Sequence, residues 1–458
     1  MVNGWHTVAP LLVLGALTMN AAQVVVPEAD PNGASANVIF LHPDGAGVNH
    51  WGALRMLEEG PDGQLEWDRL PALGVYTGHM RDALTATSHG GATVHAYGVK
   101  VLADSFGMDG TDPVTAASGR PMSIAEEAMA AGKAVGLVQT GHIAEPGTAA
   151  FVASVPSRGM REEIAAQVLA SGAQVIMAGG EGLLRPEGAD GRHGSGQRKD
   201  GRDLIAEAKA AGYTVVFTRD ELLALELDAV DRLLGVFAHG ATFNAQSEER
   251  NRAEGKDHYV AGAPTVAEMT EVALQLLQTD PDGFLAVIEE EGTDNMGNRN
   301  NAPGTLAALR RADAAVGVAH RFVGEHPDTL LLMAADSDAG GMQVIGPAPH
   351  YVKLEPGTPV PAQARNGAPL DGIEGSETPP FVAAADRFGN RLPFVIAWTS
   401  YADVSGGILV RAAGRNHDQV RPLMDNTDVY RLMYRTLFGV SPEAVRAAAG
   451  GDATPAMP

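Results

Sequence analysis

Three apolar runs of strand length recur along the chain, and each is followed within three residues by an acidic side chain. They are residues 37–41 before Asp44, residues 284–288 before Glu289, and residues 329–333 before Asp336. Uninterrupted apolar runs of about four to eight residues are typical of strands buried on both faces of a parallel sheet. Because the carboxyl ends of parallel strands meet at one edge, we expect these acidic residues to lie close together.

Helical and strand patterns alternate between these runs. Capping boxes pair Ser123 with Glu126 and Thr265 with Glu268, and each precedes an apolar helical pattern. Further helices are expected at 162–170, 305–324 and 427–437, and further strands at 134–139, 174–178, 393–398 and 407–413. The alternation predicts an α/β fold, with a large central, mostly parallel sheet and helices on both of its faces.

The pattern predicts one large domain over residues 37–440, with an irregular Pro- and Gly-rich insertion near 346–389. Residues 1–22 resemble a signal peptide, because their apolar stretch is too short to span a bilayer and ends in small residues. This predicts export to the periplasm or the extracellular space, and no stable membrane anchor once the leader is cleaved. The first residues carry no Lys or Arg, so an uncleaved anchor or a misplaced start stays open. Residues 23–36 are expected to be a linker and residues 441–458 a flexible tail.

The chain is strongly acidic and contains no cysteine. Lys and Arg number 33 against 56 Asp and Glu, for a formal charge of −23. This balance argues against a nucleic-acid-binding surface or binding to an anionic membrane. Without cysteine there is no disulfide, thiol nucleophile or thiolate metal site, so any metal must be held by oxygen and nitrogen ligands.

Ser88 ends an irregular polar segment and precedes residues that can open a helix. Free backbone N–H groups and the positive end of the helix dipole favour a phosphate or a developing negative charge at such a position. A serine there can act as a nucleophile, or it can simply cap the helix.

The order of these features resembles that of the alkaline phosphatase family over roughly residues 36–440. The matching residues are Asp44 in HPDG, Ser88 counted back from Gly98-Val99-Lys100, Arg158 in VPSR, Glu289 with Asp294, and Asp336. The resemblance implies a metal-dependent phosphomonoesterase acting on small phosphate esters. It implies that Ser88 forms a phosphoserine, that Arg158 clamps the phosphate, and that Asp44 bridges metal ions. Relatives often dimerise, which implies a homodimer here.

The departures from the family pattern concern the metal ligands. Asn298, Ser337 and Asp403 fall where zinc-dependent members carry histidine, and Thr87 replaces the usual Asp before the nucleophile. In the magnesium region, Glu145 and Gly147 fall opposite the usual ligands, and Thr148 is the better hydroxyl donor. Oxygen donors persist, and Asp338, Glu290 and Glu291 add to the acidity. Hard oxygen ligands suit Mg²⁺, Ca²⁺ or Mn²⁺ better than Zn²⁺, so we expect divalent cations with one or both zinc sites altered.

Several alternatives stay open at this point. His42, His89 or His417 can supply a ligand from a new direction. Thr87 can be the nucleophile of a superfamily relative that hydrolyses phosphodiesters, phosphonates or sulfate esters. A phosphate-binding homologue without catalytic activity is the third reading.

Overall fold

The computed structural model describes residues 36–346 and 358–450. The predicted signal peptide and all but the last residue of the predicted linker lie outside these ranges. No helix in the described ranges is long and apolar enough to cross a lipid bilayer.

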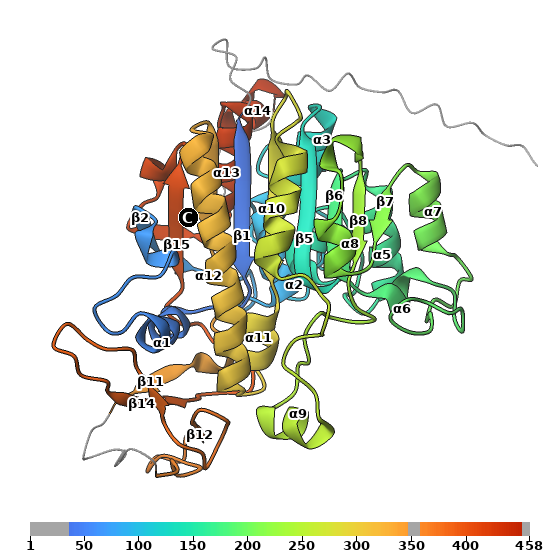
Figure 1. Ribbon diagram of the computed structural model, residues 1–458. Coiled ribbons are helices and arrows are strands. Elements are labelled where there is room, and N and C mark those ends of the chain that lie inside the picture. Colours follow the sequence, from blue (N-terminus) through green and yellow to red (C-terminus); the bar gives the residue numbers. More distant parts are fainter. Residues whose placement is uncertain (1–35, 347–357, 451–458) are drawn as a thin grey trace, which may run out of the picture.

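A ten-stranded sheet forms the centre of the molecule, with the strand order β16-β2-β15-β10-β1-β9-β5-β6-β8-β7 (Figure 1). Neighbouring strands are parallel except at β15, which runs antiparallel to both β10 and β2. This confirms the predicted mostly parallel sheet. The strands are β1 (Asn37–Pro43), β2 (Ala72–Thr77), β5 (Ala134–His142), β6 (Val175–Gly179), β7 (Thr214–Val216), β8 (Leu233–Val236), β9 (Phe284–Glu290), β10 (Thr329–Met333), β15 (Leu409–Gly414) and β16 (Leu423–Asp425).

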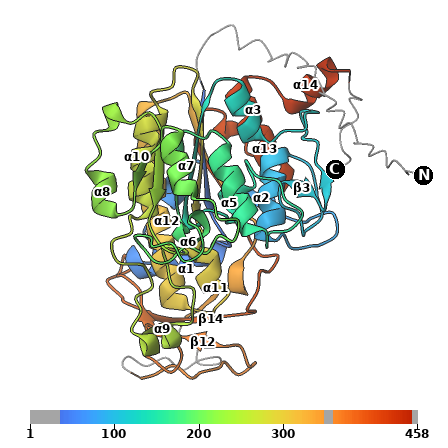
Figure 2. The ribbon, with the colours of Figure 1, turned by 90° about the vertical axis from the view of Figure 1, so that its right-hand side faces the viewer.

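The central strands are apolar throughout because a hydrophobic core covers each face of the sheet. In β1, Val38 and Phe40 enter one core, while Ile39 and Leu41 enter the other. Seen along the sheet, helices lie on both sides of it (Figure 2). One core contains side chains from α2 (Ser88–Tyr97), α3 (Ile124–Ala130), α4 (Pro146–Ala149), α5 (Arg161–Ala170), α6 (Glu181–Leu184), α7 (Leu204–Ala210) and α13 (Asn426–Phe438). The other contains side chains from α1 (Val48–Glu58), η1 (Trp67–Arg69), α8 (Arg219–Leu223), α10 (Val266–Leu277) and α12 (Ala302–Glu325). Both predicted capping boxes are present, at the starts of α3 and α10.

The insertion and the residues that flank it form a small second sheet, a difference from the predicted irregular segment. Its strands are β11 (Gln343–Ile345), β12 (Leu370–Asp371), β13 (Phe381–Val382) and β14 (Pro393–Ala397), and all pairings with β14 are antiparallel. The strand predicted at 393–398 therefore belongs to this sheet and not to the central one. Residues 347–357 of the insertion lie outside the described ranges.

The remaining elements are short. They are β3 (Met108–Asp109), β4 (Asp112–Pro113), η2 (Leu227–Ala229), α9 (Glu248–Glu254), α11 (Gly292–Gly297), η3 (Ala339–Gly341), η4 (His417–Gln419) and α14 (Pro442–Ala448). Helix α14 falls in the segment expected to be a flexible tail. The Ser441 side chain accepts a hydrogen bond from the backbone N–H of Ala444, and Pro442 occupies the first turn, so this segment carries its own helix-start signal.

Candidate active site

The three acid-tipped strands are neighbours and end level with one another. Leu41 of β1 pairs with Met333 of β10 on one side and with Ile288 of β9 on the other. Asp44, Glu289 and Asp336 therefore gather at one edge, as the sequence predicts, and each is at most 2% exposed. Helix α11, which follows β9 directly, adds Asp294 to the same buried group.

Asp44 is common to two groups of side chains that can each hold a cation. The first comprises His42, Asp44 and Glu289, and the second comprises Asp44, Glu291 and Asp294; within each group the ligand atoms lie within 4.8 Å of one another. Within the described part of the chain, several buried oxygens of this cluster lack a hydrogen-bond partner: Asp44 Oδ2, both oxygens of Glu289, Glu291 Oε2 and Asp336 Oδ2. Unpaired buried carboxylate oxygens are costly, so this donor set fits divalent cations well.

Crowding of the carboxylates changes their affinity for protons. Burial, followed by the charge of Asp44, raises the pKa of Glu289 to about 8. Burial also works to raise the pKa of Asp44, but the hydrogen bond and the charge of His42, helped by the nearby Asp336 and Ser88, outweigh it and hold that pKa below its usual range. Burial lowers the pKa of His42, yet the partnership with Asp44 prevails and raises it to about 10. His42 Nδ1 donates to Ala334 O at 2.7 Å, and its Nε2 lies 3.2 Å from Asp44 Oδ1.

Ser88 is the first residue of α2, and the preceding Thr87 caps that helix. The Thr87 hydroxyl accepts from the backbone N–H of Gly90 at 3.1 Å and donates to Ala103 O at 2.6 Å. The capping role is therefore taken by Thr87, and the Ser88 hydroxyl is left to interact with Asp44. Helix α2 can approach the cluster closely because residue 91 is a glycine: a Cβ there would lie 2.7 Å from Asp336 Cβ.

Arg158 belongs to a chain of polar contacts beside Ser88. Its Nη2 donates to Glu145 Oε2 at 3.2 Å, and its Nη1 lies 3.5 Å from His89 Nδ1. The other nitrogen of His89 contacts Asp104 at 3.0 Å, which places His89 beside the arginine and outside both cation-holding groups. Glu145 Oε1 lies 2.9 Å from His142 Nε2. Burial works to raise the pKa of Glu145, but His142 and Arg158 outweigh it, and the pKa is lowered.

Gly147 gives room to the Glu289 carboxylate. A Cβ at this position would lie 1.8 Å from Glu289 Oε1, so no hydroxyl-bearing side chain fits there. The adjacent Thr148 is buried, and its hydroxyl oxygen accepts a hydrogen bond from Gln139 Nε2 at 2.6 Å. Gln139 Oε1 is buried without a partner. Neither Gln139 nor His142 is among the site residues predicted from sequence; their place on β5, next to β9, is known only from the structure.

The side-chain amide of Asn298, a position predicted from sequence as a ligand, makes three hydrogen bonds. Its amide nitrogen donates to Asp294 Oδ1 and to Asp403 Oδ1, each at 2.9 Å. Its oxygen accepts from the backbone N–H of Gly340 at 2.9 Å. Asn298 therefore links two carboxylates where a ligand was expected. Ser337 likewise donates to Asp336, at 3.1 Å.

Asp338 is buried beside the main cluster. Its Oδ1 lies 3.4 Å from His50 Nδ1, and its backbone pairs with Val404. Burial, followed by the charge of Asp403, raises the pKa of Asp338 to about 7. It belongs to neither cation-holding group among the described residues.

His417 lies at the wrong edge of the sheet to be a ligand. Strand β15 runs antiparallel to β10 and pairs Gly414 with Leu330, near the start of β10. His417 follows this end of β15, and its Nδ1 contacts Gly414 O at 2.6 Å. The carboxylate cluster lies at the opposite end of β10, so the suggestion of His417 as a ligand is wrong.

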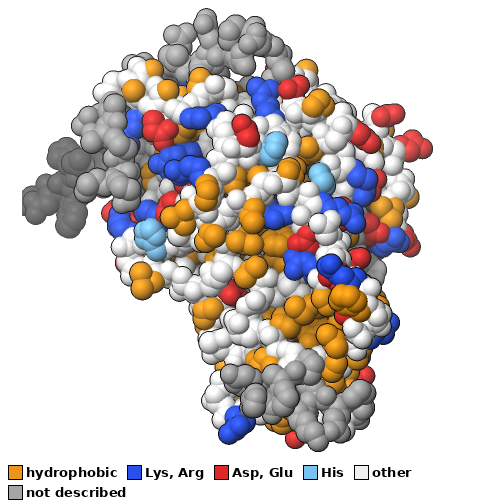
Figure 3. Space-filling model, turned by 90° about the vertical axis from the view of Figure 1, so that its left-hand side faces the viewer, with side chains coloured by type: hydrophobic (Ala, Val, Ile, Leu, Met, Phe, Trp, Pro, Cys, Tyr) orange, Lys and Arg blue, Asp and Glu red, His pale blue; other side chains and the backbone are white. Residues whose placement is uncertain are grey.

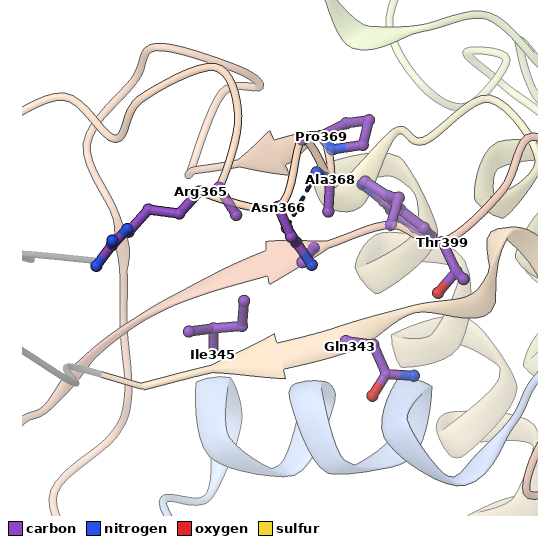
Figure 4. Close-up of a pocket in the computed structure, with 11 residues that line it drawn as sticks. Gln343, Ile345, Arg365, Asn366, Ala368, Pro369 and Thr399 are labelled. Carbon is purple, nitrogen blue, oxygen red and sulfur yellow. Dashed lines mark hydrogen bonds between the residues drawn. The ribbon is translucent and has the colours of Figure 1, made fainter. Parts of the chain in front are cut away.

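A cavity of about 800 Å³ lies in the insertion, bordered by Gln343, Ile345, Arg365 and Thr399 (Figure 4). None of the site residues predicted from sequence lines it. The buried carboxylates at the sheet edge carry the reactive chemistry, so we place the candidate active site there.

Fold and site together define an α/β protein with a serine beside a carboxylate-rich cation site. The alkaline phosphatase family model matches residues 35–437, so the chain belongs to the alkaline phosphatase family. The tissue-nonspecific alkaline phosphatase of Gallus gallus is 30% identical over 338 residues, a match that covers 66% of this chain and 63% of that protein. Alkaline phosphatase H of Pseudomonas aeruginosa is 28% identical over 373 residues, covering 73% of this chain and 75% of that one.

Solved structures show the same fold. The alkaline phosphatase of Thermus thermophilus superposes with a TM-score of 0.66 at 24% identity, covering 92% of this chain and 96% of that one. A variant of the enzyme from the Antarctic bacterium TAB5, solved with bound magnesium, gives a TM-score of 0.65 at 20% identity, covering 88% of this chain and 98% of that one.

Proposed function

We propose that this protein is a metal-dependent phosphomonoesterase that hydrolyses small phosphate esters through a phosphoserine on Ser88. The observation that carries the proposal is the position of Ser88. Its hydroxyl is free of the capping role, lies near enough to Asp44 to help lower the pKa of that carboxyl, and stands at the N-terminus of α2. The membership of the chain in the alkaline phosphatase family supports the same reaction.

In the proposed reaction the Ser88 Oγ forms a bond to phosphorus while the bond from phosphorus to the ester oxygen breaks. Water then takes the phosphoryl group from Ser88 and restores the hydroxyl. The planar guanidinium of Arg158 would hold two phosphate oxygens, and His89 and Glu145 orient it. The first backbone N–H groups of α2 add donors beside Ser88.

We infer that divalent cations are held by His42, Asp44 and Glu289 and by Asp44, Glu291 and Asp294. Bound there, they would supply positive charge to the phosphate oxygens and lower the pKa of the attacking hydroxyl. Oxygen dominates these donors, which favours Mg²⁺, with Ca²⁺ or Mn²⁺ as alternatives; Zn²⁺ fits best where His42 contributes. The magnesium in the TAB5 variant supports this choice.

Substitution of two adjacent residues tests the nucleophile. Ser88→Ala should abolish turnover of a chromogenic phosphate monoester. Thr87→Ala should retain turnover and lower the stability of the protein by about 1 kcal/mol, because the helix cap is lost. The reverse order would assign the nucleophile to Thr87 and favour the phosphodiester, phosphonate or sulfate-ester reading. Phosphate-dependent thermal stabilisation without turnover of any ester would favour a non-catalytic phosphate binder.

We also propose that the protein is exported and forms a homodimer. Apolar side chains of β2 and β16, namely Leu73, Val75 and Leu423, are 48–61% exposed at one edge of the central sheet. The view from that side shows hydrophobic side chains gathered on this face (Figure 3). Such a patch is typical of an interface between subunits. Light scattering of the wild type and of Leu73→Lys tests the dimer.

A further inference from the structure

Helix α9 docks on the insertion through polar contacts. Glu249 Oε1 accepts from the Ser376 backbone N–H at 3.3 Å and from the Ser376 hydroxyl at 3.1 Å. Arg252 donates to the backbone oxygen of Glu374. Two segments more than one hundred residues apart in sequence are thereby held together below the central sheet (Figure 1).

Two side chains on one face of α9 are buried with unpaired oxygens. Glu248 is 3% exposed, and neither of its carboxylate oxygens has a hydrogen-bond partner among residues 36–346 and 358–450. Asn251, three residues later, is 1% exposed, and its Oδ1 is also without a partner. The Asn251 amide nitrogen donates to Asn244 O at 3.0 Å, which fixes the orientation of the amide. Both residues line a cavity of about 430 Å³.

Further carboxylates converge on the same place. A Cβ on Gly375 would lie 2.6 Å from Glu248 Oε1 and 2.9 Å from Glu249 Oε1, so both oxygens approach this glycine closely. Asp371 of β12 is 5% exposed, and its charge, after burial, helps to raise the pKa of Glu248 to about 8. Three basic residues line the cavity, and each has another contact: Lys256 with Glu254 at 2.8 Å, Arg252 with Glu374 O, and His258 Nδ1 with Asn301 Nδ2 at 3.4 Å. The charge of Arg252 lowers the pKa of Glu248 but does not offset burial and Asp371. The Glu248 carboxylate is thus buried beside other acids without a hydrogen bond from a basic group.

We propose that Glu248 and Asn251 hold a calcium ion, with Glu249 within reach, and that this ion ties α9 to residues 371–376 of the insertion. The donors are all oxygens, which Ca²⁺ accepts in flexible sets of about six to eight, and the cavity leaves room for water to complete the set. An unpaired buried carboxylate is strongly destabilising, and a bound cation removes that cost. The site shares no residue with the candidate active site.

Glu248→Gln tests the proposal, with Glu254→Gln as the matched control, because both remove one negative charge from the same helix. After dialysis against Ca²⁺, the wild type and the control should retain one more calcium ion per chain than Glu248→Gln, measured by elemental analysis. In chelator, Glu248→Gln should melt at or above the wild type, because an unpaired carboxylate has been removed. With Ca²⁺ the order should reverse, while phosphate-ester turnover stays within about twofold of the wild type.

Equal calcium content in all three proteins, or the same melting order in both conditions, would overturn the site and identify Glu248 as a buried neutral carboxyl. Should Glu248→Gln not fold, crystals of the wild type soaked in Mn²⁺ decide the question. An anomalous peak between Glu248 and Asn251 supports the site, and its absence contradicts it. Each readout is independent of the nucleophile, so failure here leaves the proposed hydrolysis intact.

Discussion

The side-chain amide of Asn298 joins the Asp403 carboxylate to that of Asp294, at 2.9 Å in each case. An imidazole at this position would instead present a nitrogen lone pair to a metal. The structure therefore uses the position to hold two acids together, and a hydrogen-bonded amide takes the place of a ligand.

Replacing Asn298 with histidine should move the metal preference toward zinc. The substitution adds an imidazole nitrogen, a donor that suits Zn²⁺ better than Mg²⁺, and releases Asp294 and Asp403 from their shared amide. After chelation, the affinity for Zn²⁺ relative to Mg²⁺, measured by the concentrations that restore activity, should rise by about tenfold. This corresponds to roughly 1.4 kcal/mol of binding free energy. Zinc content and activity after add-back provide the measurement. An unchanged order of metals would contradict this account of position 298.

Removal of the Arg158 guanidinium should weaken transition-state binding. Hydrogen bonds to charged groups contribute about 1.5–3 kcal/mol, so Arg158→Ala should lower kcat/KM by roughly 10- to 150-fold. Arg158→Lys should recover only part of the loss, because an ammonium cannot form two parallel hydrogen bonds. Steady-state kinetics on a phosphate monoester measure both. If the kcat/KM of Arg158→Ala equals that of the wild type, Arg158 does not bind the phosphate.

A methyl group at position 147 should disturb the cation site without unfolding the protein. The added Cβ would lie 1.8 Å from Glu289 Oε1, so the carboxylate must move. We expect Gly147→Ala to lose about 10- to 100-fold in metal affinity, the range for disturbed ligand shells. Gly240→Ala is the control, since no atom lies within 4 Å of a Cβ there. Equal metal affinity in the two variants would show that Glu289 is not a ligand.

The stability of the protein should depend on pH through Asp313, far from the site. Burial raises the pKa of Asp313 from 3.8 to about 6, although the backbone N–H groups of Trp67 and Glu66 donate to it and oppose the rise. The folded state therefore keeps this proton to a higher pH than the unfolded state. Its contribution to stability should fall as the pH rises from 3.8 to about 6 and stay constant above that range. Urea unfolding of the wild type and Asp313→Asn across this range should show the difference; a flat difference would contradict it.

The clustering of acidic residues at one edge of the sheet could be predicted because each strand and the acid after it are close in sequence. An apolar strand followed by an acid is readable for Asp44, Glu289 and Asp336, and parallel pairing brings the three together. Gln139 and His142 could not be found in this way. Gln139 lies within β5 and His142 at its end. Their roles depend on which strand pairs with β5, and the strand order could not be predicted from the sequence.

The direction of a side chain and the direction of a strand could not be predicted from the sequence. Asn298 has both a donor and an acceptor, and only the nearby Gly340 N–H determines which of them faces the carboxylates. His417 was placed near Asp403 because the two are close in sequence. Antiparallel β15 lies between them and carries the chain to the other edge of the sheet.

Detection of the phosphorylated enzyme tests the central claim most directly. The protein, loaded with divalent cation, is mixed with a phosphate monoester, quenched in acid and analysed by peptide mass spectrometry. We predict a phosphate group on Ser88 that disappears in Ser88→Ala and accumulates when hydrolysis of the intermediate is slow. Turnover accompanied by a phosphate group on Thr87, or by no covalent phosphate at any pH, would contradict the assignment of Ser88 as the nucleophile.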